Sequence, residues 1–133
     1  MADYTIIFDG GSLGNPGRGY GSYALVSRSG SATIERLNLG EDMTNNEAEY
    51  DTLIAALHDL IGHIEATGRK PSTYTVEVRG DSSLVLKQVE GSWKARDERM
   101  RARRDQVRQL LSRFKAARLT LQPRAATLKV LGH

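Results

Sequence analysis

The chain has 133 residues, of which 39% are hydrophobic, so it is long enough to bury one core and too short to bury two. It contains no cysteine, which excludes disulfide bonds and thiolate zinc sites. No stretch approaches the roughly 18 apolar residues of a membrane span, and the first residues lack a signal segment. We therefore expect a cytoplasmic protein with no membrane association.

The hydrophobic pattern predicts a strand-rich first third followed by alternating strands and helices. Strands are expected over 3–9, 20–27 and 32–39 with a glycine-rich turn over 10–19, then a helix over 44–67, a strand over 73–79, helices over 82–91 and 97–116, and a last strand over 118–122. Three hairpin-linked strands followed by this alternation favour an α/β fold, with a mixed five-stranded sheet and helices on both faces.

Three carboxylates stand where an apolar run meets a turn or a helix start. Asp9 follows an alternating apolar run and precedes two glycines, so it is predicted to end a strand. Asp81 follows a second strand-like run and one glycine. Glu49 lies in the first turns of the long helix, on the side of its apolar stripe. If that stripe packs on a sheet whose strands end in Asp9 and Asp81, the three acids converge.

Converging carboxylates need a positive partner, because uncompensated they repel and raise one another's pKa. Divalent cations are the natural partner, and oxygen-only ligands favour Mg²⁺ or Mn²⁺ over zinc. Each acid taken alone is equally well explained as an ordinary turn or helix-start residue. The motifs around them favour the metal site.

Three segments resemble the signatures of type 1 ribonuclease H. They are Asp9-Gly10-Gly11-Ser12-Leu13-Gly14-Asn15-Pro16-Gly17, Thr44-Asn45-Asn46-Glu47-Ala48-Glu49-Tyr50 and Gly80-Asp81-Ser82, and their order and spacing match over residues 3–124. The resemblance implies the ribonuclease H fold and an endonuclease that cuts the RNA strand of RNA–DNA hybrids to give 5′-phosphate products. It makes Asp9, Glu49 and Asp81 the catalytic residues and the ligands of two Mg²⁺ ions, with Mn²⁺ also possible.

Glu47 competes with Glu49 for the role of the helix acid. In the family the glutamate lies three positions after the second Asn of the Asn-Asn pair, which selects Glu49. The pattern Thr44-x-x-Glu47 is a capping box, in which the two side chains satisfy amides at the helix start. Glu47 is therefore predicted to be structural.

Polar residues near the acids form the expected substrate-binding set. By themselves they are ordinary turn and cap residues. The resemblance implies that residues matching Ser12, Asn15, Asn45, Asn46 and Ser83 contact the minor groove of the hybrid, and Thr44 is added to this set. Amides suit this role because they can both donate to and accept from a 2′-OH, the group that distinguishes RNA from DNA.

Charge is distributed unevenly along the chain. Residues 1–78 hold 5 Lys/Arg and 11 Asp/Glu, whereas residues 79–133 hold 14 and 5, so the net charges are −6 and +9. The densest basic segment is 93–104, and from it Trp93, Lys94, Arg101 and Arg104 are predicted to contact the hybrid. A solvated helix face accounts for about half of these charges. Acids beside a basic surface nevertheless suit an enzyme that cuts a polyanion, because cations neutralise the phosphates around the cut.

The end of the chain departs from the family. The family usually follows the last strand with Pro-Arg and then an Ala-Asp pair that supplies a fourth carboxylate on a C-terminal helix. Aligning Pro123-Arg124 with that motif places Leu131 at the fourth acid, and no acid follows Asp105. The C-terminal helix is therefore expected to be missing, with His133 and the terminal carboxylate as alternative ligands. Weaker metal affinity or a preference for Mn²⁺ is expected.

These expectations describe one ribonuclease H-like domain over 1–133, with a monomer favoured. Two alternatives remain open. One is a module that binds RNA–DNA hybrids or double-stranded RNA but has lost turnover with the fourth acid. The other is a nuclease or integrase-like relative of the same fold that acts on double-stranded RNA or DNA.

Overall fold

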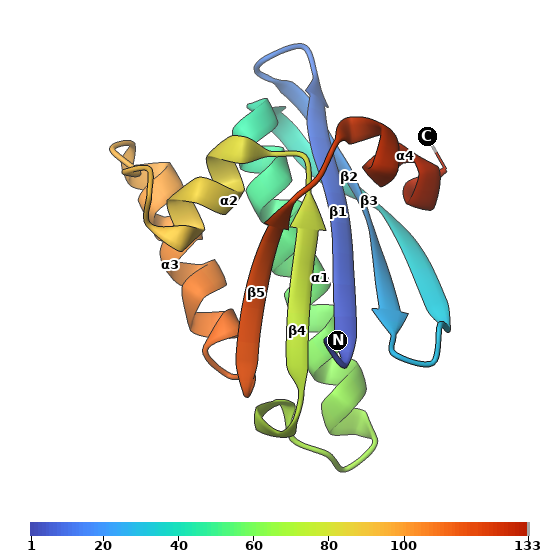
Figure 1. Cartoon of the computed structure of the whole chain (residues 1–133). Coiled ribbons are helices and arrows are strands. Elements are labelled where there is room, and N and C mark those ends of the chain that lie inside the picture. Colours follow the sequence, from blue (N-terminus) through green and yellow to red (C-terminus); the bar gives the residue numbers. More distant parts are fainter. Residues whose placement is uncertain (133) are drawn as a thin grey trace.

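The computed structural model describes residues 1–132 as a five-stranded sheet with helices on both faces (Figure 1). The elements are β1 (Tyr4–Leu13), β2 (Gly17–Ser27), β3 (Ala32–Met43), α1 (Asn45–Ala66), the short 3-10 helix η1 (Pro71–Thr73), β4 (Thr75–Gly80), α2 (Ser83–Glu90), α3 (Glu98–Leu111), β5 (Ala116–Leu121) and α4 (Arg124–Leu131). The predicted α/β fold is confirmed. The proposed ligand His133 lies outside the described residues, and within 1–132 no helix has the length and apolar character needed to cross a membrane.

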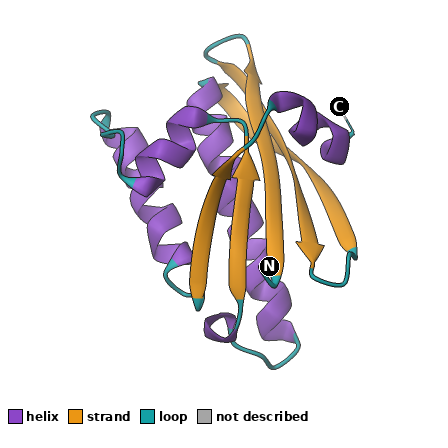
Figure 2. Ribbon diagram, in the orientation of Figure 1, coloured by secondary structure: helices purple, strands orange, loops and turns teal. Residues whose placement is uncertain are grey.

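The sheet has the strand order β3-β2-β1-β4-β5, with β1, β2 and β3 antiparallel and β4 and β5 parallel to β1. Helices α1, α2 and α3 lie on one side of the sheet and α4 on the other (Figure 2). Because β1, β4 and β5 run in the same direction, their carboxyl ends meet at one edge of the sheet. Ile7 pairs with Arg79 and Gly80 pairs with Leu121, so the residues after β4 and β5 come close to the middle of β1, just past Ile7.

The core forms because β1 presents alternate side chains to opposite faces. Ile6 and Phe8 are fully buried in the main cluster, together with the apolar stripe of α1. Ile7 points to the other face and packs with Ala24 and Leu131 in a small separate cluster. The strand therefore anchors α1 on one side and α4 on the other.

The first three strands are longer than predicted, and the expected turn over 10–19 is reduced to residues 14–16. Two glycines of these strands lie where α1 approaches the sheet closely. A Cβ atom on Gly10 would lie 2.6 Å from the carbonyl oxygen of Ala48, and one on Gly21 would overlap the Thr52 hydroxyl. These glycines remain in the strands and make room for a helix, a role that sequence alone does not separate from turn formation.

The last quarter of the chain also differs from the prediction. Helix α3 ends at Leu111 rather than at 116, and β5 begins at Ala116. The expectation of a missing terminal helix is wrong, since Arg124–Leu131 forms α4. Pro123 precedes its first turn with the extended backbone of an N-cap, and Gly132 ends it in the left-handed conformation at φ 74°.

Candidate active site

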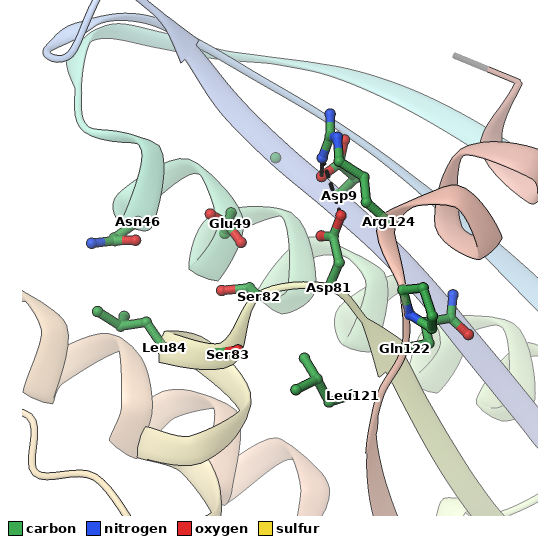
Figure 3. Close-up of a pocket in the computed structure, with 12 residues that line it drawn as sticks. Asp9, Asn46, Glu49, Asp81, Ser82, Ser83, Leu84, Leu121, Gln122 and Arg124 are labelled. Carbon is green, nitrogen blue, oxygen red and sulfur yellow. Dashed lines mark hydrogen bonds and ion pairs between the residues drawn. The ribbon is translucent and has the colours of Figure 1, made fainter.

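An open cleft of about 790 Å³ lies at the edge of the sheet where the parallel strands end (Figure 3). It is bordered by the middle of β1, by the ends of β4 and β5 and by the first turns of α1 and α2. Asp9 lies within β1, so the expectation that it ends a strand is wrong. Asp9, Glu49 and Asp81 all line it. The structure thus brings the three predicted acids from three separate elements into one cavity.

Local packing places each acid. Asp9 precedes Gly10, the residue against which the first turns of α1 pack, so Glu49 is held beside this part of β1. Asp81 follows Gly80, where a Cβ atom would lie 2.6 Å from the Phe8 ring. After Asp81 the chain turns at once into α2, because the Ser82 hydroxyl accepts a hydrogen bond from the Val85 amide at 3.2 Å.

Burial and neighbouring negative charges disfavour the ionised form of Glu49 in the cleft. Burial raises the pKa of Glu49 to about 7, and the negative charges of Asp81 and Asp9 add to this, although a hydrogen bond with Ser82 and the charge of Arg124 oppose it. Asp9 is buried, with 7% of its surface exposed. A cation entering the cleft would therefore relieve an unfavourable concentration of negative charge.

The donor set fits a hard divalent cation, since all three acids offer carboxylate oxygens from a partly buried cleft. The three carboxylates are, however, not arranged around a single ion position. Within residues 1–132, no group of three His, Asp or Glu side chains is close enough to enclose an ion as it stands. Small side-chain rotations within the cleft would be needed to bring the oxygens onto one ion.

Arg124 is a site residue that sequence reasoning missed. Its Nη1 atom lies 3.4 Å from Asp9 Oδ1 and 3.1 Å from Asp81 Oδ2, as the dashed lines in Figure 3 show. Asp9 and Asp81 in turn hold the pKa of the arginine above its usual value. The sequence did contain a signal for Arg124: if β1, β4 and β5 are parallel, the residues that follow β4 and β5 lie at the same edge of the sheet, near Asp9 and Asp81.

The second helix acid has the predicted structural role. The Glu47 carboxylate accepts a hydrogen bond from the Thr44 amide at 3.1 Å, and the Thr44 hydroxyl accepts one from the Glu47 amide at 3.1 Å. This confirms the capping box. Although burial opposes it, hydrogen bonding with Thr44 and the charges of Arg103 and Arg99 hold the pKa of Glu47 below its usual value.

Most of the predicted polar substrate contacts lie in or beside the cleft. Asn46 and Ser83 line the acidic cleft itself. A second cavity of about 470 Å³ includes Asn15, Thr44, Asn46 and Lys94 in its lining, so Asn46 borders both cavities. The remaining two residues are tied to this group, since Asn45 Oδ1 accepts from the Ser12 amide at 2.8 Å and the Asn45 amide donates to Asn15 Oδ1 at 3.1 Å.

Three residues of the basic segment line neither cavity. Trp93 is 46% exposed, and the Lys87 ammonium lies 5.6 Å from its ring centroid. Arg104 pairs with Asp105 at 3.0 Å, and Arg101 is exposed near the end of α3 closest to the second cavity. Their assignment to the hybrid stays a prediction.

Position 131 does not reach the acids. Leu131 is fully buried against Ile7 and Ala24 on the face of the sheet that α4 covers. An aspartate there would place a charge in an apolar cluster, where an unpaired carboxylate is costly. Although the alignment places Leu131 at the fourth acid, Leu131→Asp would therefore not supply a fourth ligand to the cleft.

A mixed sheet of this strand order, with one acid within β1, one just after the parallel strand β4 and one on the crossing helix, defines a ribonuclease H-like protein. The family model described as RNase H matches residues 1–133, and the chain belongs to this family. Ribonuclease HI of Halobacterium salinarum is 40% identical over 118 residues, which cover 89% of this chain and 55% of that protein. The bifunctional protein Rv2228c of Mycobacterium tuberculosis is 34% identical over 118 residues, covering 88% of this chain and 30% of that protein. The chain thus spans about half or less of the length of these relatives.

Solved structures agree with the fold. The crystal structure of RNase H1 from Halobacterium salinarum has a TM-score of 0.80 and 38% identity, covering 93% of this chain and 88% of that one. LC11-RNase H1 in complex with an RNA/DNA hybrid has a TM-score of 0.82 and 27% identity, covering 95% and 89%.

Proposed function

We propose that the chain is a metal-dependent endonuclease that hydrolyses the RNA strand of RNA–DNA hybrids. The observation that carries the proposal is the grouping of Asp9, Glu49 and Asp81 in one cleft, in a chain of the RNase H family. The hybrid is supported as the substrate because LC11-RNase H1, a relative of the same fold, has been solved with an RNA/DNA hybrid.

The three acids would hold two Mg²⁺ or Mn²⁺ ions, with Asp9 shared between them. When bound, such a pair of ions activates the attacking water and stabilises the leaving 3′ oxygen. The chain itself supplies the partly buried carboxylates and a cleft open to a large substrate. No side-chain nucleophile is required.

The second cavity extends the substrate path from the acids toward the basic segment. Asn46 borders both cavities, and Thr44 and Lys94 line the second one. Amide and hydroxyl groups next to the acids can read a 2′-OH, whereas Lys94 can neutralise a phosphate. The RNA strand would therefore lie over the acids, with its partner strand toward the basic segment.

A hybrid-binding module without turnover is the second candidate. It is favoured by two features of the C-terminal segment: Leu131 is buried away from the cleft, and Arg124 contacts two of the acids. Titrating Mg²⁺ and Mn²⁺ into a hybrid-cleavage assay separates the candidates, because the module would bind labelled hybrid at every metal concentration without cutting it.

The proposed function is tested by a matched pair of variants, Glu49→Gln and Glu47→Gln. Glu49→Gln should lower hybrid cleavage by orders of magnitude while leaving hybrid binding largely intact, since it removes a metal ligand and no phosphate contact. Glu47→Gln should cost little, because glutamine also serves a capping box. The measurement is cleavage of a labelled RNA–DNA hybrid, with double-stranded RNA and DNA as controls. The site assignment would be wrong if the two variants behaved in the reverse way.

A further inference from the structure

Arg124 contacts two acids that are much less exposed to solvent than the arginine itself. The Asp9 and Asp81 side chains are 8% and 14% exposed, whereas the Arg124 side chain is 62% exposed. A single guanidinium nitrogen lies within 3.4 Å of both carboxylates. The arginine therefore approaches the acids from the solvent side and can leave them without entering the core.

The backbone that carries Arg124 is fixed on both sides. Before it, the Gln122 amide donates to the Gly80 carbonyl at 2.9 Å and continues the pairing of β5 with β4. After it, α4 is held by the buried Leu131, whose carbonyl accepts from Arg36 Nη2 at 3.1 Å. While α4 is docked, the position of the guanidinium over the cleft thus follows from the fold, and the side chain can move without the backbone.

Resting on the proposed metal-dependent function, we propose that Arg124 is an internal counter-cation that competes with the divalent ions for Asp9 and Asp81 and so sets the affinity of the site for metal. An ion can use these carboxylate oxygens only after the guanidinium has given them up. The free energy of the lost contacts is then subtracted from the free energy of metal binding.

The competition also has a second effect on the metal-free protein. Without metal, the positive charge of Arg124 offsets part of the repulsion between Asp9 and Asp81, both of which it contacts. Removing the arginine should therefore destabilise the metal-free chain and strengthen its response to metal. These two shifts have opposite signs, which a general loss of packing would not produce.

The test is a calorimetric titration of Mg²⁺ and of Mn²⁺ into the metal-free full chain, with no nucleic acid present. The variants are Arg124→Met, Arg124→Lys and the matched control Lys129→Met, which removes the same charge from an exposed position of α4 outside the cleft. Arg124→Met should bind metal roughly five- to tenfold more tightly than the parent, and Lys129→Met should change the affinity by less than about twofold, because its charge is solvated and screened. The metal affinity of Arg124→Lys should lie between those of Arg124→Met and the parent.

Thermal denaturation supplies the second measurement. Arg124→Met should melt below the parent in chelator, and its increase in Tm on adding metal should be larger. Equal metal affinities for Arg124→Met and Lys129→Met would overturn the inference, and they would leave the proposed function standing if the parent binds metal and cuts hybrid. If the parent neither binds divalent ions nor cuts hybrid, the proposed function fails and the inference fails with it.

Discussion

Glu49 holds a proton more readily than an exposed glutamate does, because burial and two neighbouring carboxylates oppose its ionised form. Its pKa is raised from 4.5 to about 7. A folded state that binds a proton more tightly than the unfolded state is stabilised by that proton. This contribution is complete below about pH 4.5 and is lost as the pH rises through about 7.

Glu49→Gln should remove this pH dependence. In metal-free buffer the Tm of the variant relative to the parent should increase from about pH 5 to about pH 8, because only the parent has a carboxylate that must ionise in the cleft. The measurement is thermal denaturation across this range. Glu47→Gln is the control: because the pKa of Glu47 is lowered, its contribution is lost at acidic pH, and its Tm difference should stay constant above about pH 5. A flat Tm difference for Glu49→Gln would contradict the raised pKa.

The roles of single residues could be predicted from the sequence where the interacting residues are close together in the chain. Thr44 and Glu47 form the predicted capping box because both partners lie within one helical turn. Asp81 follows directly after β4, and the strand that holds Asp9 is visible from its own alternation, although β1 continues past Asp9 to Leu13. Arg124 was missed because its partners are far away in sequence, and only the register of β4 with β5 brings it over them.

Among the elements, the contact between α1 and β1 decides where Glu49 stands. Gly10 permits this contact, since a Cβ atom there would lie 2.6 Å from the Ala48 carbonyl oxygen. Gly62 lies in the same helix with nothing within 4 Å of its added Cβ position. Alanine substitutions at these two glycines therefore form a matched pair, one in a crowded position and one in an open position.

Gly10→Ala should destabilise the protein by about 1–3 kcal/mol, because the new methyl group presses on helix backbone that cannot rotate away. Gly62→Ala should stabilise it by about 0.5–1 kcal/mol through helix propensity. Urea denaturation measures both free energies of unfolding. If Gly10→Ala were as stable as the parent, the close packing of α1 on β1 would not be what requires a glycine there.

The boundaries of elements were harder to predict than their existence. Glycines at 10, 11, 17 and 19 indicated a turn, yet most of that segment pairs as strand. Of these four, Gly10 lies against α1, whereas Gly11 and Gly19 face the side chains of Tyr20 and Met43, and Gly17 faces the carbonyl of Leu13. The terminal helix was not expected because the family alignment emphasised a missing acid. The local pattern of Pro123, the alanines that follow and Gly132 was sufficient to predict it.

In the whole molecule, Arg101 and Arg103 of α3 have different surroundings, although they look alike in sequence. Arg103 donates to Asp51 at 2.8 Å and lies 3.5 Å from Glu47, so it links α3 to the start of α1. Arg101 is exposed, and the contact seen for it is a long one of 3.5 Å to the carbonyl of Arg96. Of these two arginines, Arg101 is the more accessible to a phosphate.

Arg101→Ala should therefore reduce the slope of log affinity for hybrid against log salt by roughly 0.7–0.9 while leaving stability unchanged. Arg103→Ala should lower the free energy of unfolding and leave the slope nearly unchanged. Hybrid binding at several salt concentrations, together with urea denaturation, checks both. Equal slopes for the parent and Arg101→Ala would mean that this arginine is merely solvated.

Helix α4 is attached to the rest of the protein by a small apolar cluster of its own, separate from the main core. Elements held in this way can open and close as units while the remaining structure stays folded. Each opening of α4 would carry Arg124 away from the cleft and leave Asp9 and Asp81 exposed to solvent ions. The fraction of time that this helix spends undocked therefore becomes a property of the active site, and substitutions as remote as Ala24 could tune it without touching an acid.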